Sequence, residues 1–261
     1  MQSEARRTGQ MLRTYARMAM ACLAALLVLG TVTLSVSAKD KEPSSEKVDS
    51  GALGIFINGK RVATETFTIQ QSPSGSVTTS EFKTEEGLDR ADQTSELQLS
   101  GSGELKKYEW KELSPGQSQA SVLPSENFLT ERYSSNPQEK PREQPFLLPA
   151  STSILDDYFF IQREVLAWKY LATACRPDKG QIQCPLKQKT QFGTLNPHAR
   201  SSMLVTLEFA GVEKLSIHGV ERDYTRLDLK SEAGDWSLWL DEQHKLVRIL
   251  VESDKTEVIR D

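Results

Sequence analysis

Two of the chain's three cysteines lie in one short polar segment, "TACRPDKGQIQCPL", residues 173–186. Cys175 and Cys184 could bind a metal, remain free thiols or form a disulfide. A metal site is disfavoured, because zinc normally takes four ligands and this segment contains no histidine. In an oxidising compartment a disulfide would close a small loop, to which the chain-entropy model assigns about 2.5 to 3 kcal/mol. We therefore predict a structural disulfide and no metal.

The three histidines offer no further site. His198, His218 and His244 each fall in a turn-like segment, without an i, i+4 partner and without a neighbouring cysteine. Solvated turn residues are thus favoured over metal ligands or catalytic bases. The sequence also lacks a Gly-x-Ser-x-Gly elbow, a P-loop, a His-Glu-x-x-His pair and a dinucleotide fingerprint. These observations predict a protein that is not an enzyme and uses no cofactor.

Residues 18–38, "MAMACLAALLVLGTVTLSVSA", carry no charge and follow four arginines. Such a segment is typical of a signal peptide or a membrane anchor. Val36-Ser37-Ala38 has the small residues of a cleavage site, whereas the long basic start and the length of the apolar stretch favour a single transmembrane helix. Both interpretations place the body of the protein outside the cytoplasm, in the periplasm, with the membrane as a partner through residues 1–38.

The charge of the body argues against nucleic acid as a partner. The formal net charge of the chain is −4, and the first 38 residues contribute +3, which leaves −7 for the remainder. Binding to a phosphate backbone needs clustered Lys and Arg. A hydrophobic small molecule or a lipoprotein remains compatible with this composition.

Residues 39–50 are charged and contain proline, which predicts a disordered tether. We expect residues 51–261 to form a single β-rich domain, with strands across 53–133 and the Asn58-Gly59 pair at the first hairpin turn. The alternation in "LKKYEWKEL" puts Tyr108 and Trp110 on one face of a strand. Four prolines in residues 134–149 predict a long exposed crossing without regular structure.

A helix is predicted over residues 153–172, "SILDDYFFIQREVLAWKYLA", with Ser153 and Asp156 forming an approximate capping box. Its apolar arc is wider than a helix on a flat surface needs, so we expect the sheet to surround it. The cysteine loop, 173–186, follows. Residues 189–261 then predict a meander of strands, in which Trp236 and Trp239 point to opposite faces. The expected fold is α+β and mostly β: a strongly curved antiparallel half-barrel around one central helix.

The hairpin "INGKRVATETFTI", the internal apolar helix and the closing meander "WSLWLDEQHKLVRILVES" together resemble the LolA/LolB-like lipoprotein-carrier superfamily of the periplasm, and more closely its uncharacterised half-barrel relatives. The resemblance covers residues 51–261 as a pattern. It implies a curved sheet that shelters acyl chains next to a helix. The proline-rich crossing and the cysteine loop depart from that pattern, and no set of lipid-binding residues can be carried over.

Aromatic residues supply the remaining signal for a site. They form a packed core by default, but a half-barrel too wide for one helix would retain an apolar cavity. The predicted lining is Phe67, Tyr108, Trp110, Tyr158, Ile161, Val165, Trp168, Val205 and Phe209. The expected function is therefore a binding protein for a lipid or a lipoprotein acyl chain. The alternative is a membrane-tethered interaction or envelope-sensing domain with a packed interior.

Overall fold

The computed structural model describes residues 44–261 apart from 86–89 and 179–180. The predicted export segment, residues 1–38, lies outside the described residues, as does the first part of the predicted tether. The described residues belong to one compact unit. Within the described residues no helix is long and apolar enough to cross a membrane.

Strands dominate the described chain. The first half of the sheet contains β1 (Glu46–Ile57), β2 (Lys60–Ser72), β3 (Gly75–Thr84), β4 (Asp92–Ser100), β5 (Leu105–Ser114), β6 (Gln119–Ser125), β7 (Phe128–Ser134) and β8 (Arg142–Phe146). The short strand β9 (Ser153–Ile154), the helix α1 (Gln162–Ala174) and a small hairpin of β10 (Arg176–Asp178) and β11 (Gln181–Gln183) follow. The second half contains β12 (Lys189–Asn196), β13 (Ser201–Ile217), β14 (Val220–Ser231), β15 (Gly234–Leu240), β16 (Leu246–Val251) and β17 (Thr256–Arg260).

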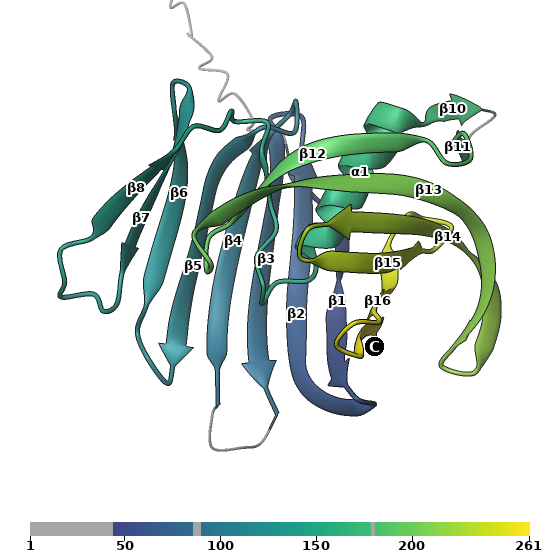
Figure 1. Ribbon diagram of the computed structural model, residues 1–261, viewed down its shortest axis with the longest axis horizontal. Helices are drawn as coiled ribbons and strands as arrows, with labels where there is room; N and C mark the ends of the chain where they lie inside the picture. Colours follow the sequence, from purple (N-terminus) through teal and green to yellow (C-terminus); the bar gives the residue numbers. More distant parts are fainter. Residues whose placement is uncertain (1–43, 86–89, 179–180) are drawn as a thin grey trace, which may run out of the picture. The chain divides into compact units, whose positions relative to one another are not determined.

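All of these strands except β10 and β11 belong to one fifteen-stranded sheet. Sequence neighbours pair antiparallel in each half, and β1 pairs with β17 to join the halves. Among the described strands, only β9 and β12 pair in parallel. The sheet is strongly curved but not closed, since β8 and β9 form its two edges. Figure 1 shows α1 within the curve of this sheet. For the described residues, the mostly β architecture with one helix is as the sequence predicts.

The turns follow the local sequence. Asn58 and Gly59 both have positive φ, 52° and 76°, which is the backbone of a two-residue hairpin turn. His218 and Gly219 repeat this geometry between β13 and β14, with φ of 51° and 77°. The predicted Asn-Gly hairpin is therefore confirmed.

Two predicted irregular segments contain strands. β1 begins at Glu46, inside the predicted tether, because this part of the chain pairs with the end of β2. β8 lies inside the predicted proline-rich crossing and pairs with β7. Pro145 is tolerated there because an edge strand needs hydrogen bonds on one side only. Both predictions of irregular structure were wrong for these residues.

The helix begins later than predicted. Ser153 and Ile154 form β9, and α1 starts only at Gln162. The carboxylate of Asp156 accepts a hydrogen bond from the Tyr158 N–H at 3.0 Å, which holds a turn and leaves the predicted capping box unformed. The N–H groups that precede α1 are bound by a residue from β2, as described below.

Both tryptophans of β15 are covered, although they point to opposite faces. Trp236 packs against the main core on the concave face. Trp239 lies on the outer face and is only 3% exposed, because the β13–β14 hairpin folds over it. Arg226 and Arg248 place their guanidinium groups over its ring, and its Nε1–H donates to Glu213 at 3.0 Å. A long hairpin thus buries the tryptophan that would otherwise face solvent.

Cys175 and Cys184 form the predicted disulfide, with an S–S distance of 2.01 Å. The bond joins the end of α1 to the residue that follows β11. It fixes the small hairpin to the helix.

Replacing both cysteines, Cys175→Ser with Cys184→Ser, is expected to lower the free energy of unfolding by about 2.5 to 3 kcal/mol, because the unfolded chain regains the entropy of a short loop. Urea denaturation of the full chain measures this loss. Cys22→Ser serves as the control and should leave the urea midpoint unchanged. An unchanged midpoint in the double variant would contradict a stabilising role for the bond.

Candidate functional site

A cavity of about 360 Å³ lies on the concave side of the sheet, between α1 and strands β2 to β4. Its volume is within the range of small-molecule sites. The apolar part of its lining is Leu97, Leu99, Ile154, Val165, Leu166, Trp168 and Ala172. Polar residues complete the lining: Gln71, Ser76, Ser102, Thr152, Ser153, Gln162, Lys169 and Thr173, with Gly101 and Gly103.

Helical and strand periodicity bring the apolar wall together. Val165, Trp168 and Ala172 are three and four residues apart on α1 and therefore share one face. Leu97 and Leu99 alternate along β4 and both face the concave side. The Nε1–H of Trp168 donates to the carbonyl oxygen of His244 at 2.7 Å, which fixes the indole at the wall of the cavity.

The turn between β2 and β3 approaches β4 closely at this end of the cavity. Gly75 has a φ of +142°, and a Cβ at this position would lie 1.9 Å from the carbonyl oxygen of Leu99. Only glycine fits such a position, because it has no Cβ. The glycine thus allows the turn to close against the strand that carries Leu97 and Leu99.

A buried carboxylate on β2 holds the start of α1. Glu65 accepts hydrogen bonds from the N–H groups of Phe160, at 2.7 Å, and Ile161, at 3.2 Å. These donors precede the first helical turn and would otherwise lack a partner. Burial raises the pKa of Glu65 to about 7, although the hydrogen bonds oppose this rise. The helix is therefore capped by tertiary structure instead of by its own sequence.

A second buried carboxylate connects α1 to the seam between the two halves of the sheet. Glu164 accepts from the Leu246 N–H at 2.6 Å and from Arg260 at 2.9 Å. Burial and the nearby Asp49 raise the pKa of Glu164 to about 9. Asp49 is also desolvated, but hydrogen bonds to Arg260 and Glu164 and the charges of Arg260 and Lys245 outweigh that effect and lower its pKa. The cluster ties α1 to β1, β16 and β17.

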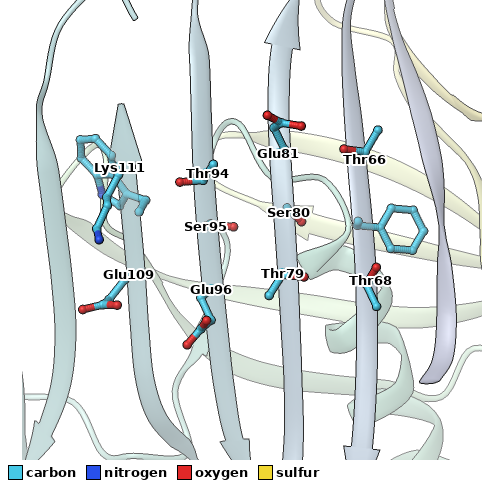
Figure 2. Close-up of a pocket in the computed structure, with 12 residues that line it drawn as sticks. Thr66, Thr68, Thr79, Ser80, Glu81, Thr94, Ser95, Glu96, Glu109 and Lys111 are labelled. Carbon is cyan, nitrogen blue, oxygen red and sulfur yellow. The ribbon is translucent and has the colours of Figure 1, made fainter. Parts of the chain in front are cut away.

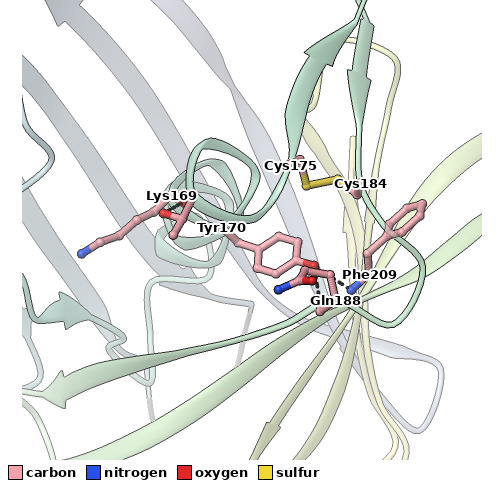
Figure 3. Close-up of a disulfide and its surroundings, with 7 residues drawn as sticks. Lys169, Tyr170, Cys175, Cys184, Gln188 and Phe209 are labelled. Carbon is pink, nitrogen blue, oxygen red and sulfur yellow. Dashed lines mark hydrogen bonds between the residues drawn. A yellow bond between two sulfur atoms is a disulfide. The ribbon is translucent and has the colours of Figure 1, made fainter.

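The other end of α1 is held near the disulfide. The Tyr170 hydroxyl donates to the Gln188 carbonyl oxygen at 2.6 Å and accepts from the Phe209 N–H at 3.0 Å. Figure 3 shows this pair of hydrogen bonds beside the Cys175–Cys184 bond. Lys169, which lines the cavity, extends from α1 away from the disulfide in this view.

A separate polar cluster lies around Asp156, which is fully buried. Its Oδ2 accepts from the Tyr108 hydroxyl at 2.7 Å and lies 2.6 Å from His198 Nδ1. The imidazole stacks on Trp110 with a centroid distance of 3.8 Å, and its Nε2 lies 2.9 Å from Gln93 Oε1. Both ring nitrogens therefore bond to protein groups, which favours a structural role over general base catalysis.

The prediction that His198 is a solvated turn residue was wrong, because its side chain is only 13% exposed. It does lie in the turn between β12 and β13, but this turn packs on β4 and β5. His218 is in the predicted turn and its Nε2 lies 2.6 Å from the Arg260 carbonyl oxygen. Residues of the described ranges include no group of three or more that could hold a metal ion.

Glu131 is a buried acid without a hydrogen-bond partner. It is 0% exposed, and neither carboxylate oxygen has a partner in the described structure. Burial raises the pKa of Glu131 to about 8; the charge of Asp156 acts in the same direction and that of Arg200 opposes it. A neutral, protonated carboxyl is thus favoured at this position in the folded protein.

The outer face of β2 to β5 carries a second hollow, of about 450 Å³. Figure 2 shows its lining, in which the outward-pointing side chains are Thr66, Thr68, Thr79, Glu81, Thr94, Glu96, Glu109 and Lys111. Glu81 pairs with Lys83 at 2.6 Å, and Glu109 with Lys107 at 2.9 Å. Hydroxyls and charged groups on an open sheet face do not make an apolar site, so the concave cavity is the better candidate.

Of the nine residues predicted to line a cavity, Val165 and Trp168 line this concave one, whereas Phe67 and Trp110 border the outer hollow and Val205 a smaller pocket. The structure places five others in the buried core: Phe67, Tyr108, Trp110, Ile161 and Val205. Tyr158 and Phe209 are partly buried and pack against that core. The sequence interpretation missed Leu97 and Leu99, although "SELQLS" alternates clearly enough to suggest them. No sequence signal pointed to Lys169.

Comparison with known proteins adds no relative. No family model, no curated protein and no solved structure matches the chain. The resemblance to the lipoprotein carriers therefore rests on the sequence pattern alone.

Proposed function

We propose that this protein is an extracytoplasmic binding protein that holds a hydrophobic ligand, such as an acyl chain, in the cavity between α1 and strands β2 to β4. The observation that supports this most directly is the cavity of about 360 Å³ with the side chains of Leu97, Leu99, Val165, Leu166 and Trp168 in its wall. An apolar ligand that displaces water from this wall lowers the free energy of the system, because apolar surface is removed from water.

One feature of the sequence and one of the structure support an extracytoplasmic location. The apolar stretch at residues 18–38 is typical of export or anchoring, and the Cys175–Cys184 disulfide suits an oxidising compartment. The pattern resemblance to the lipoprotein carriers implies the same class of ligand. The proposal is non-enzymatic, because the buried His198 and Asp156 bond to protein groups and not to an open cleft.

The alternative function is a membrane-tethered interaction or envelope-sensing domain. It is favoured by the dense packing elsewhere on the concave side, where Tyr108 and Ile161 are 0% exposed and Val205 is 1% exposed. The two functions differ in whether a ligand enters the cavity. Native mass spectrometry of the full chain purified from membranes, with a search for a bound lipid, separates them.

Filling the cavity tests the proposed function directly. Val165→Phe adds an aromatic ring to the cavity wall, so we expect the affinity for 1-dodecanol to fall at least tenfold. The loss of stability should be smaller than the about 1 to 3 kcal/mol that overpacking a dense core costs, because the ring enters a cavity. Isothermal titration calorimetry of the delipidated full chain measures the affinity. Val212→Phe is the matched control, because Val212 is 66% exposed and lies on β13. Equal affinities in the two variants, or no binding by the wild-type chain, would reject the proposal.

A further inference from the structure

We propose that the cavity selects a single-chain amphiphile with a carboxylate headgroup, which binds to Lys169 and Thr152 at the polar edge of the cavity. This inference rests on the proposed function and names the class of ligand. Both residues line the cavity, and Lys169 shares it with Val165 and Trp168, which come from the same helix.

Lys169 brings a positive charge that the described protein does not neutralise by a close ion pair. Its ammonium donates to the carbonyl oxygen of Ser151 and to Ser153 Oγ at 3.3 Å, and both acceptors are neutral. In the described parts of the chain no carboxylate oxygen lies within 4.0 Å of it. An ammonium has three donors, so a third hydrogen bond is still available. An anionic ligand would supply both the missing charge and the third acceptor.

Thr152 adds a second polar residue to this part of the lining. It is 3% exposed, and its Oγ1 is buried without a hydrogen-bond partner among the described residues. Thr152 stands between Ser151 and Ser153, the two residues that Lys169 contacts, so the backbone of Thr152 runs beside the ammonium, and both residues line the cavity. A carboxylate has two oxygens and can accept from both groups, and such charge-assisted hydrogen bonds are stronger than neutral ones.

Next to this polar edge the cavity wall is apolar, so a headgroup and an alkyl chain would bind to different parts of the cavity. Ile154 directly follows Ser153 and lines the cavity together with Leu166 of α1. Leu97 and Leu99 continue the apolar wall along β4. A ligand with its carboxylate at Lys169 can therefore place an unbranched alkyl chain against these side chains. One alkyl chain is the more suitable occupant for a volume of about 360 Å³.

Glu104, on the turn between β4 and β5, is the acid whose charge acts on Lys169. Burial lowers the pKa of Lys169, and the charge of Glu104 opposes that shift. Glu104 itself is exposed and forms no ion pair with Lys169 within 4.0 Å. It would repel an incoming carboxylate, so its neutralisation should strengthen binding.

The test compares two ligands that share a chain length but differ in the headgroup, dodecanoate and 1-dodecanol, by calorimetry with the delipidated full chain. We expect the wild type to prefer dodecanoate at least tenfold. Lys169→Met should reduce this preference to below threefold by weakening dodecanoate alone, and Lys169→Arg should retain it. Lys106→Met is the matched control, because Lys106 is an exposed lysine on β5 outside the cavity, and its preference should equal that of the wild type.

Two further variants make the test independent of Lys169. Thr152→Val keeps the shape of the side chain but removes the hydroxyl. It should lower the affinity for dodecanoate several-fold and leave the affinity for 1-dodecanol unchanged. Glu104→Gln should raise the affinity for dodecanoate. Equal affinity of the wild type for both ligands, or a preference that survives both Lys169→Met and Thr152→Val, would overturn the headgroup site while leaving the hydrophobic cavity in place. If the wild type bound neither dodecanoate nor 1-dodecanol, the proposed function would be overturned as well.

Discussion

Raising the pH from 5 to 9 is expected to lower the free energy of unfolding of this protein by several kcal/mol. Three glutamates with little or no exposure cause this dependence. Burial raises the pKa of Glu65 to about 7, of Glu131 to about 8 and of Glu164 to about 9. An unfolded chain releases the same protons near the ordinary glutamate pKa of about 4.3.

The sign follows from proton binding. Between the unfolded and the folded pKa, the folded protein keeps a proton that the unfolded chain has lost, so stability falls as the pH rises. The stabilisation is complete below about pH 4.3 and is lost as the pH passes through the folded value of each group. Each unit of pKa difference corresponds to about 1.4 kcal/mol, so Glu131 alone contributes on the order of 3 to 5 kcal/mol to the dependence.

Glu131→Gln tests the contribution of Glu131, the buried glutamate without a hydrogen-bond partner in the described structure, to the pH dependence of stability. The amide cannot ionise, so the slope of stability against pH between 5 and 8 should become clearly shallower, whatever the effect on stability at pH 5. Urea denaturation of the full chain at several pH values gives the slope. Glu143→Gln is the matched control, because Glu143 is an exposed glutamate on the neighbouring strand and pairs with the exposed Arg132. A slope that is the same in both variants would show that Glu131 is not protonated in the folded state.

Asp156→Ala should cost about 3 to 5 kcal/mol of stability, because it removes one partner of a buried polar cluster. The carboxylate accepts from the Tyr108 hydroxyl and the Tyr158 N–H and contacts His198 Nδ1. Each of these three groups would lose its partner, and leaving one buried polar group unsatisfied costs about 1 to 3 kcal/mol.

The adjacent Asp157 provides the control for this prediction. It is exposed, and its Oδ1 accepts a hydrogen bond from Asn196 Nδ2 at 2.7 Å. Asp157→Ala should therefore cost about 1 kcal/mol or less. Thermal and urea unfolding of both variants at pH 7 give the difference. Similar losses in the two variants would mean that Asp156 does not connect the β12–β13 turn to β5.

The loss should also have a local signature. The β12–β13 turn packs on β5 through the stacking of His198 on Trp110. Hydrogen exchange should therefore increase in this turn in Asp156→Ala before it increases in β1 and β17, which lie at the seam of the two halves.

The sequence alone determined those features that depend on neighbouring residues. Asn58-Gly59 fixes a hairpin because both residues adopt positive φ with little strain, and alternation places Tyr108 and Trp110 on one face of β5 because strand side chains alternate. The two close cysteines could form a bond with little rearrangement of the chain. A mostly β chain with one apolar helix follows from the same local patterns.

Only the tertiary structure decided where the helix starts, which residues line the cavity and which polar groups are buried. Glu65 caps the chain before α1 from a strand almost a hundred residues earlier, which no local capping pattern reveals. Trp239 is buried because the preceding β13–β14 hairpin folds over it, which the alternation along β15 does not reveal. The cavity joins Leu97 on β4 to Lys169 on α1, so its existence depends on how far the curved sheet stands from the helix. Such spacing is set by the packing of the whole sheet, since burial and cavity shape are properties of contacts between distant segments.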